Sequence, residues 1–201
     1  AASDVYKRQV LRILVESRHS EVRCAIASCA NAPEDVVERL GEDSDSDVRQ
    51  AVIERSSLPA EWRFLANVQK VEKLRSDAGY TDIEILRLLS KSGDADVRRE
   101  VASLSNTPNE VLHSLLLDSD SSVADSALQS LLPLEWKGLK VKDLVEKLGA
   151  LQEPDTSLLS LLAKSDEYEI RIAVASSPFT PDNVRAELLE DNDDEVMWAA
   201  L

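Results

Sequence analysis

Residues 21–27 read Glu-Val-Arg-Cys-Ala-Ile-Ala, and this run decides the fold because its pattern returns along the chain. Each copy has an acidic or polar residue, a branched apolar residue and usually an arginine, followed by small and apolar residues. Further copies lie at residues 47–53, 96–102, 122–128, 169–175 and 195–201, the third and last of which have Ala124 and Met197 in place of the arginine. A pattern that returns in this way indicates an internal repeat.

The spacing of the branched residues alternates between a short and a long interval. These residues are Val22, Val48, Val97, Val123, Ile170 and Val196, which follow one another at intervals of 26, 49, 26, 47 and 26 residues. The higher-order period is therefore 75 and then 73 residues, and Trp62 and Trp136 lie 74 residues apart. A fixed period of this kind predicts a solenoid, in which each unit buries its apolar face against its neighbours.

Each short unit is predicted to be a pair of short helices. In the first copy the apolar residues fall at positions i, i+3 and i+4, on one face of a helix that Ser20 can cap. Pro33 predicts the start of the second helix, because a proline in the first turn loses no hydrogen bond, and Gly41 predicts its end. Residues 106–112 and 179–185 repeat the proline-led start.

The long units carry a further helix. We expect helical structure from residues 58–62 through residues 71–74, a break at 78–82 and another helix over 83–90. The second long unit repeats this order at residues 132–136, 144–148, 149–155 and 157–164, and residues 10–17 match its last helix. The predicted fold class is all-α, with short units of about 26 residues alternating with long units of about 47–49.

The short units resemble the leucine-rich repeat variant (LRV) family, a relative of the HEAT and armadillo α-solenoids. The resemblance rests on Asp-x-(Asp/Glu)-Val-Arg, Ala-(Val/Ile)-Ala-Ser, Asn-Thr-Pro-x-x-Val and Leu-x-x-Asp-x-Asp, and it is close over residues 20–45, 95–120 and 166–192. It implies a right-handed superhelix of paired short helices that serves as a binding surface, and it implies no reaction. Founding members of the family carry a cysteine cluster with an iron–sulfur centre. This chain has only Cys24 and Cys29, so no cofactor is expected.

Both ends of the sequence are unusual. Residues 3–9 resemble the in-frame translation of a transposase adapter used in sequencing libraries, so we expect residues 1–9 to be a non-native leader. At the other end, residues 196–201 fall inside a repeat helix. We therefore expect residues 10–201 to form a single solenoid fragment, truncated at both ends.

The composition argues against several classes of protein. The chain has 201 residues, with 38 Asp and Glu against 23 Lys and Arg and a net charge of −15. Such an excess of acids argues against non-specific nucleic-acid binding, which depends on Lys and Arg. The apolar runs are far shorter than the roughly 18 residues of a membrane span. Two cysteines require no oxidising compartment, so we expect a cytoplasmic protein.

One acidic stretch has part of the pattern of a calcium loop. Residues 43–47 read Asp-Ser-Asp-Ser-Asp, and Glu54 stands eleven residues after Asp43, where such loops place a bidentate carboxylate. The sixth position, however, is Val48 and not the glycine that the loop needs. Similar acids precede helices at residues 118–120 and 191–194, and helix capping explains all of them without a metal.

Four arginines and two tryptophans are the candidate binding residues. The arginines occupy the same position of the repeat and are Arg23, Arg49, Arg98 and Arg171. They form either a basic track for an acidic peptide or phosphate or, as we favour in so acidic a chain, a ladder of pairs with acids of the adjacent repeat. Trp62 and Trp136 are either binding residues or, as their equivalent positions favour, packing residues between helices.

No catalytic or metal site is predicted. His19 and His113 are the only histidines, and they lie in unrelated phases of the repeat with no Ser, Cys or second His at a recurring spacing. We therefore expect a non-catalytic scaffold that binds a protein or peptide on its concave face, with no small-molecule substrate. The alternatives are an enzyme on a HEAT-like scaffold, such as a DNA glycosylase with a basic concave face, and a purely structural spacer in a larger protein.

Overall fold

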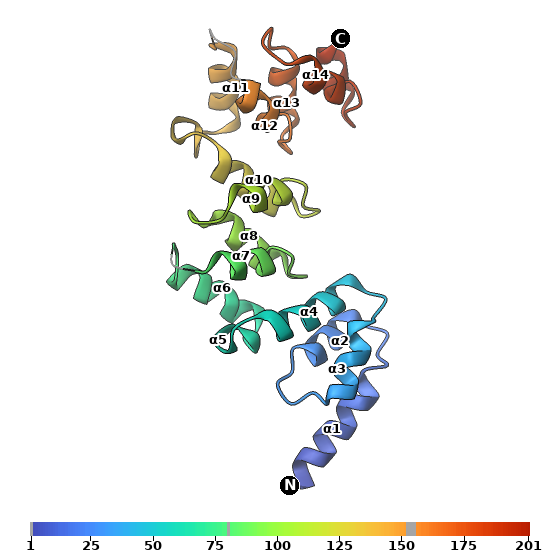
Figure 1. Cartoon of the computed structure of the whole chain (residues 1–201). Helices are drawn as coiled ribbons and strands as arrows, with labels where there is room; N and C mark the ends of the chain where they lie inside the picture. The colour runs from blue at the N-terminus through green and yellow to red at the C-terminus, as the bar shows by residue number, and fades with distance from the viewer. Residues whose placement is uncertain (1, 80, 152–155) are drawn as a thin grey trace. The chain divides into compact units, whose positions relative to one another are not determined.

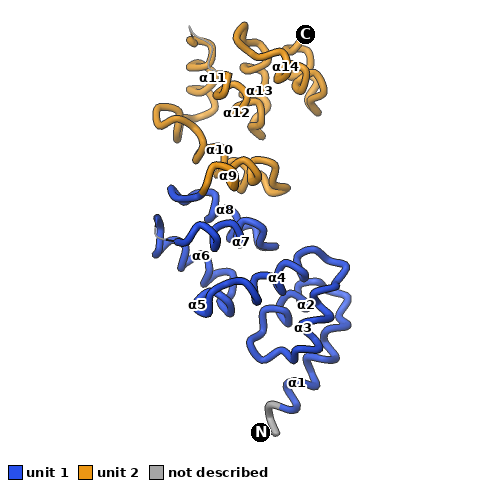
Figure 2. The backbone as a smooth tube through the Cα atoms, in the orientation of Figure 1, with its two compact units in different colours: residues 1–107 blue, residues 108–201 orange. Residues whose placement is uncertain are grey.

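The computed structural model describes residues 2–79, 81–151 and 156–201, and within these ranges all regular structure is helical (Figure 1). Consecutive helices are short and pack against their neighbours along the chain. The prediction of an all-α fold built from repeated short helices is therefore confirmed. The chain forms two compact units, residues 1–107 and residues 108–201, which are described separately below (Figure 2).

Unit 1 contains the first eight helices of the chain. They are α1 (Ala2–Leu14), α2 (Ser20–Ala27), α3 (Glu34–Gly41), α4 (Ser46–Ser57), α5 (Ala60–Arg63), α6 (Asn67–Ser76), α7 (Ile83–Leu89) and α8 (Ala95–Ser103). Helix α2 packs against α1, α3 and α4, and α6 packs against α8. The two helices of a short unit thus meet each other as well as the first helix of the next unit. Helix α1 includes residues 2–9, which we expected to be a leader.

Unit 2 repeats this order from the second helix of a short unit onward. Its elements are α9 (Asn109–Leu115), α10 (Ser121–Leu131), the 3₁₀ turn η1 (Leu134–Trp136), α11 (Val141–Gly149), α12 (Thr156–Leu162), α13 (Tyr168–Ala175), α14 (Asp182–Leu188) and α15 (Asp194–Ala200). Helix α13 packs against α11 on one side and α15 on the other. The long unit is thus α10, η1, α11 and α12, the counterpart of α4 to α7 in unit 1.

Aspartates cap four of the helices that carry the repeat pattern, whereas α2 and α13 begin after His19 and Glu167, which make no side-chain cap bond. The Asp45 carboxylate accepts a hydrogen bond of 2.9 Å from the backbone N–H of Asp47 at the start of α4. Asp94, Asp120 and Asp193 do the same for α8, α10 and α15. The capping explanation of the acidic stretches is therefore confirmed. The expectation that Ser20 caps α2 is wrong. Ser20 is the first residue of the helix, and the N-cap position before it is occupied by His19.

The prolines stand one residue earlier than predicted. Pro33, Pro108 and Pro181 are the N-cap residues of α3, α9 and α14, with extended backbone angles, and do not belong to the first helical turn. Proline suits this position because its ring already fixes φ near the observed −60° and it needs no hydrogen-bond acceptor there.

The branched residues of the repeat form the centre of the core. Val48, Val97, Val123 and Val196 are fully buried and Ile170 is nearly so, while Val22 in the first copy is half-buried. Leucines of the second helices, such as Leu40, Leu115 and Leu188, cover them from the other side. Since burial of each such side chain contributes about 1.5–3 kcal/mol, these positions supply much of the stability of each unit.

The breaks inside the long units lie close to where the sequence places them. In unit 1, α6 ends at Ser76 and α7 begins at Ile83, and Gly79 between them has a φ of +81°, which favours glycine. In unit 2, α11 ends at Gly149, and residues 152–155 of the predicted break lie outside the described residues. Among the described helices, none combines the length and the apolar character that crossing a membrane requires.

Candidate functional site

The four repeat arginines hold the loop that leads into their own helix. Each guanidinium donates to the backbone carbonyl six residues earlier, which fixes the turn before the helix begins. The donor and acceptor pairs are Arg23 and Ser17, Arg49 and Asp43, Arg98 and Ser92, and Arg171 and Ser165, three of them at 2.7–2.9 Å. The arginine after the branched residue therefore holds the preceding loop through this hydrogen bond, which we call the loop clamp.

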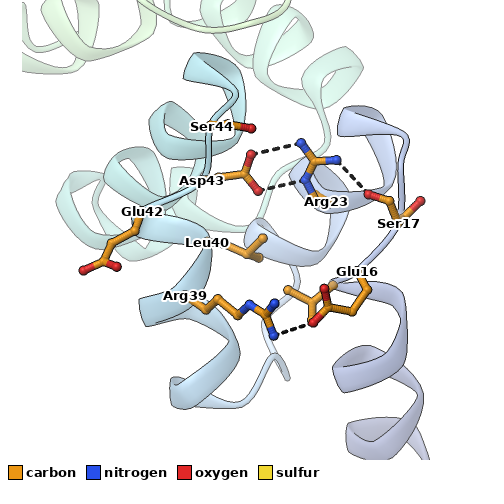
Figure 3. A pocket seen from close by; sticks show the side chains of 9 residues that line it. Glu16, Ser17, Arg23, Arg39, Leu40, Glu42, Asp43 and Ser44 are labelled. Carbon is orange, nitrogen blue, oxygen red and sulfur yellow. Dashed lines mark hydrogen bonds and ion pairs between the residues drawn. The ribbon is translucent and has the colours of Figure 1, made fainter.

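Two of these arginines also hold an aspartate of the next repeat. Arg23 donates from Nε and Nη2 to the Asp43 carboxylate at 2.8 and 2.9 Å, and the two side chains are only 14% and 11% exposed (Figure 3). Arg171 and Asp191 form the same bidentate pair in unit 2. The hydrogen bond from Arg23 lowers the pKa of Asp43, so this carboxylate is ionised at neutral pH. These two pairs have the geometry that the predicted ladder requires.

A hollow of about 380 Å³ lies beside the Arg23–Asp43 pair (Figure 3). Its second arginine, Arg39, forms an ion pair with Glu16. Both arginines that line the hollow are thus neutralised by carboxylates of the same chain. The hollow offers an incoming anion no free basic group, which removes the reason to interpret it as a phosphate site.

The two tryptophans lie in the interior. Trp62 and Trp136 are 3% and 4% exposed. A lysine ammonium one to two turns into the following helix lies over each ring, Lys73 at 5.0 Å and Lys147 at 4.4 Å from the ring centre. These cation–π contacts fix the short helical turn against the next helix of the long unit. Such burial matches the packing interpretation of both residues.

Each of the six predicted residues has a partner inside its own unit. In unit 1, the structure brings Arg23 and Arg49 together, because the carboxylate and the carbonyl of Asp43 accept from one arginine each. Arg98 and Trp62 contact other partners in unit 1, and Arg171 and Trp136 do so in unit 2.

A larger hollow, of about 710 Å³, lies elsewhere in unit 1, on the side-chain face that α2 and α4 share. We call it the unit 1 groove. Its lining comes from α2, from α4, from the start of α6 with the loop before it, and from the loop before α8, and consists of residues 20, 21, 24, 25, 28, 47, 51, 54, 64–67, 70 and 92–94.

The groove occupies fixed positions of the repeat. In α2 and α4 its residues stand one or two before and two, three or six after the branched residue, as Glu21, Cys24, Ala25 and Ser28 do around Val22. These positions form one helical face, adjacent to the buried one. The sequence analysis did not single them out, although their periodic placement is a signal that could have identified them.

A buried ion pair lies under the groove. Lys70 of α6 donates to Glu54 of α4, and the two side chains are 6% and 7% exposed. Burying two charges is costly unless they are paired, so each depends on the other. In the second long unit the place of Lys70 is taken by Leu144, which belongs to the apolar core. The charged pair is thus particular to unit 1.

One end of the groove is acidic. Glu21 and Asp47 are exposed in the first turns of α2 and α4, and Asp94 caps α8 while accepting a hydrogen bond of 2.9 Å from Asn67. A Cβ atom on Gly93 would lie 2.9 Å from the Cβ and Cγ atoms of Asp47, so only glycine allows the loop to approach α4 this closely.

The rest of the groove surface is small and apolar. Ala25 and Ala51 line it from α2 and α4, and Phe64, 46% exposed, and Leu65 add apolar surface from the loop before α6. Phe64 is held in place by Arg55, which lies 5.5 Å from the ring centre. The groove therefore has the combination of a polar end and an apolar wall that suits a peptide side chain and its neighbours.

Unit 2 has a hollow of about 450 Å³ between α11 and α13, and its α13 residues stand at the repeat positions that α2 contributes to the unit 1 groove. Here the surface is more apolar, since Ile172 stands where α2 has Cys24, although Glu169 keeps the position of Glu21. Phe179 and Leu148 complete it. The same face of the repeat is thus hollowed in both units but with different chemistry.

No arrangement typical of a metal or catalytic centre accompanies these hollows. In the part of the chain that the structure describes, no three His, Cys, Asp or Glu side chains are placed to hold a metal ion. Asp43 and Asp45 of the calcium-like stretch accept from Arg23 and from backbone N–H groups. His19 and His113 are both exposed and lie outside the described hollows.

Searches with protein-family models, among curated proteins and among solved structures gave no match to this chain.

Proposed function

We propose that the chain is a non-catalytic protein-interaction scaffold that binds a peptide segment of a partner on the face of the repeat that carries the unit 1 groove. The observation that carries the proposal is the division of roles within the repeat. The branched residue and the arginine after it serve the core and the loop, and the positions beside them line a hollow in each unit. We also propose that the repeat is of the LRV type within the HEAT-like α-solenoids.

Peptide binding fits the dimensions and the chemistry of the groove. A hollow of about 710 Å³ has room for several side chains of a peptide. Helical repeats present such surfaces on rigid elements, so little conformational entropy is lost in the scaffold when a peptide binds.

The two alternatives require other features. A DNA glycosylase on such a scaffold needs a basic face and aromatic side chains around a displaced base. The unit 1 groove has carboxylates at one end. The hydrogen bonds of repeat arginines such as Arg23 go to acceptors of the same chain. A structural spacer needs no hollow on this face, whereas both units have one.

Selection of twelve-residue peptides from a random displayed library on the intact chain tests the proposal. Peptides selected on the wild type should lose binding to an Ala25→Trp variant, because Ala25 is exposed in the groove and the indole would fill it. Ala186→Trp is the control, since Ala186 is exposed on α14 and outside the hollows. Peptides that bind both variants like the wild type, or a library that yields no binder, would contradict the proposal.

A further inference from the structure

We infer that the unit 1 groove selects a peptide segment that carries Lys or Arg side chains next to small or aliphatic residues. The inference rests on the proposed function and specifies the chemistry of the partner.

The charges that line the groove do not balance. They are those of Glu21, Asp47, Glu54, Asp94 and Lys70. Lys70 and Glu54 neutralise each other under the surface. In the described part of the chain, Glu21, Asp47 and Asp94 form no ion pair, so three carboxylates face the groove without a cation.

The basic side chains closest along the sequence are engaged elsewhere. Arg23 and Arg49 both contact Asp43, which does not line the groove. Arg55 donates to the carbonyl of Cys29 and lies over Phe64. The fold therefore compensates the acids of the ladder and leaves those of the groove open to an external cation.

The Cys24 thiol in the wall of the groove responds to these acids. Partial burial raises its pKa to about 11, and the carboxylates of Asp45 and Asp47 add to the effect, while Arg23 opposes it. A negative potential thus extends into the groove from its acidic end. A cationic side chain is stabilised by the same potential that destabilises a thiolate.

The apolar surface explains why we infer a peptide and not a free cation. Lys and Arg side chains bury their aliphatic stems on apolar surface while their charged ends stay among polar groups. Ala25, Ala51 and Leu65 provide that surface beside the acidic end. Acidic peptides and nucleic acids would meet uncompensated carboxylates and are disfavoured.

The first test measures binding of defined peptides by fluorescence anisotropy. The probe is a fluorescein-labelled peptide that repeats Gly-Arg-Leu-Ser three times, and its counterpart has Glu in place of Arg. We expect the Arg peptide to bind and the Glu peptide not to bind. A Glu21→Gln/Asp47→Asn double variant should bind the Arg peptide about fivefold more weakly, as expected from the loss of two exposed charge pairs.

A matched control separates the groove from the overall negative charge of the chain. Glu38→Gln/Glu72→Gln removes the same number of charges from exposed positions of α3 and α6 outside the groove, and it should change affinity less than twofold. Equal weakening by both double variants, or equal binding of the Glu peptide, would overturn the inference. If library-selected peptides nevertheless lose binding to the Ala25→Trp variant, the proposed function stands and only the inference about cationic peptides fails. If those peptides bind the Ala25→Trp variant like the wild type, the proposed function fails as well.

The second test measures the potential in the groove without any peptide. In a Cys29→Ser background, Cys24 is the only thiol, and it is treated with methanethiosulfonate reagents that carry a trimethylammonium or a sulfonate group. Both reagents need the same thiolate, so the ratio of their rates, divided by the ratio for free 2-mercaptoethanol, reports the local charge. We expect the cationic reagent to be favoured several-fold, and Glu21→Gln/Asp47→Asn to reduce that preference. A normalised ratio at or below one, or a ratio unchanged by the double variant, would contradict the inference.

Discussion

Arg23 and Asp43, twenty residues apart in the sequence, form two parallel N–H···O bonds of 2.8 and 2.9 Å in a nearly buried position between successive repeats. The same arginine donates to the Ser17 carbonyl at 2.7 Å. One side chain therefore joins the loop before its helix to the loop that leads into the next repeat. This arrangement is the basis of the first two predictions.

Replacing Arg23 by Met should destabilise the chain strongly. The substitution leaves Asp43 with a buried, unpaired charge, which costs about 2–4 kcal/mol of unfolding free energy. Urea denaturation followed by circular dichroism measures it. Arg12→Met is the matched control, because the Arg12–Asp35 pair has the same two-bond geometry but is 51% and 59% exposed, so its loss should cost less than about 1 kcal/mol. Equal costs for the two variants would contradict the assigned role.

Asp43 should make stability depend on pH at the acidic end. Its pKa is lowered in the folded state by the hydrogen bond from Arg23. The contribution of a carboxylate with a lowered pKa is fully present above the pKa of the unfolded state, about 3.9, and is lost as pH falls through the folded value. The difference in unfolding free energy between wild type and Asp43→Asn should therefore be constant from pH 7 to about 5 and shrink below pH 4. A difference that stays constant down to pH 2 would show that the carboxylate is not stabilised by folding.

Gly93→Ala should destabilise unit 1. The new Cβ would lie 2.9 Å from two atoms of Asp47, which forces the loop or α4 to move at a cost of about 1–3 kcal/mol. Gly149→Ala is the control, since nothing lies within 4 Å of its Cβ position at the end of α11, and alanine there should be neutral or stabilising by up to about 1 kcal/mol. Thermal denaturation of both variants measures the difference, and a Gly93→Ala variant as stable as wild type would refute the close approach.

Lys70→Leu should be far more damaging than its combination with Glu54→Gln. The single change leaves the Glu54 carboxylate buried without a partner, at a cost of about 3–5 kcal/mol. The double change copies the second long unit, which has Gln129 and Leu144 at these positions, and should recover most of that loss. Unfolding free energies of the wild type, both single variants and the double variant complete the cycle. Additive effects would show that the two side chains do not interact.

The repeat made much of the fold predictable. Periodic apolar residues located the helices, and the constant position of Arg23 and Arg171 anticipated a ladder, because neighbouring repeats must present the same partners to each other. The chemistry of the caps was harder to predict, since serine and aspartate are both good N-caps and only the register of the helix decides between Ser20 and its neighbours.

The unit 1 groove could not be predicted in the same way. Its hollow depends on Phe64 and Lys70, which the long unit brings back against α2 and α4, and the sequence does not specify that angle of return. From the sequence alone, Lys70 is expected at the surface, because lysine is rarely buried. The structure buries it because the Glu54 carboxylate pairs with it. The face of α2 that lines the groove, in contrast, follows directly from the helical period.

The hollowed face differs between the units at one half-buried position at the edge of the core, which the loop clamp does not use. Cys24 and Ala25 in α2 correspond to Ile172 and Ala173 in α13, although Arg23 and Arg171 keep the same bonds beside them. Such a repeat can be re-engineered one face at a time. Transplanting the isoleucine as Cys24→Ile should change which ligands unit 1 accepts and leave its melting temperature nearly unchanged, which makes the chain a modular starting point for designed binders.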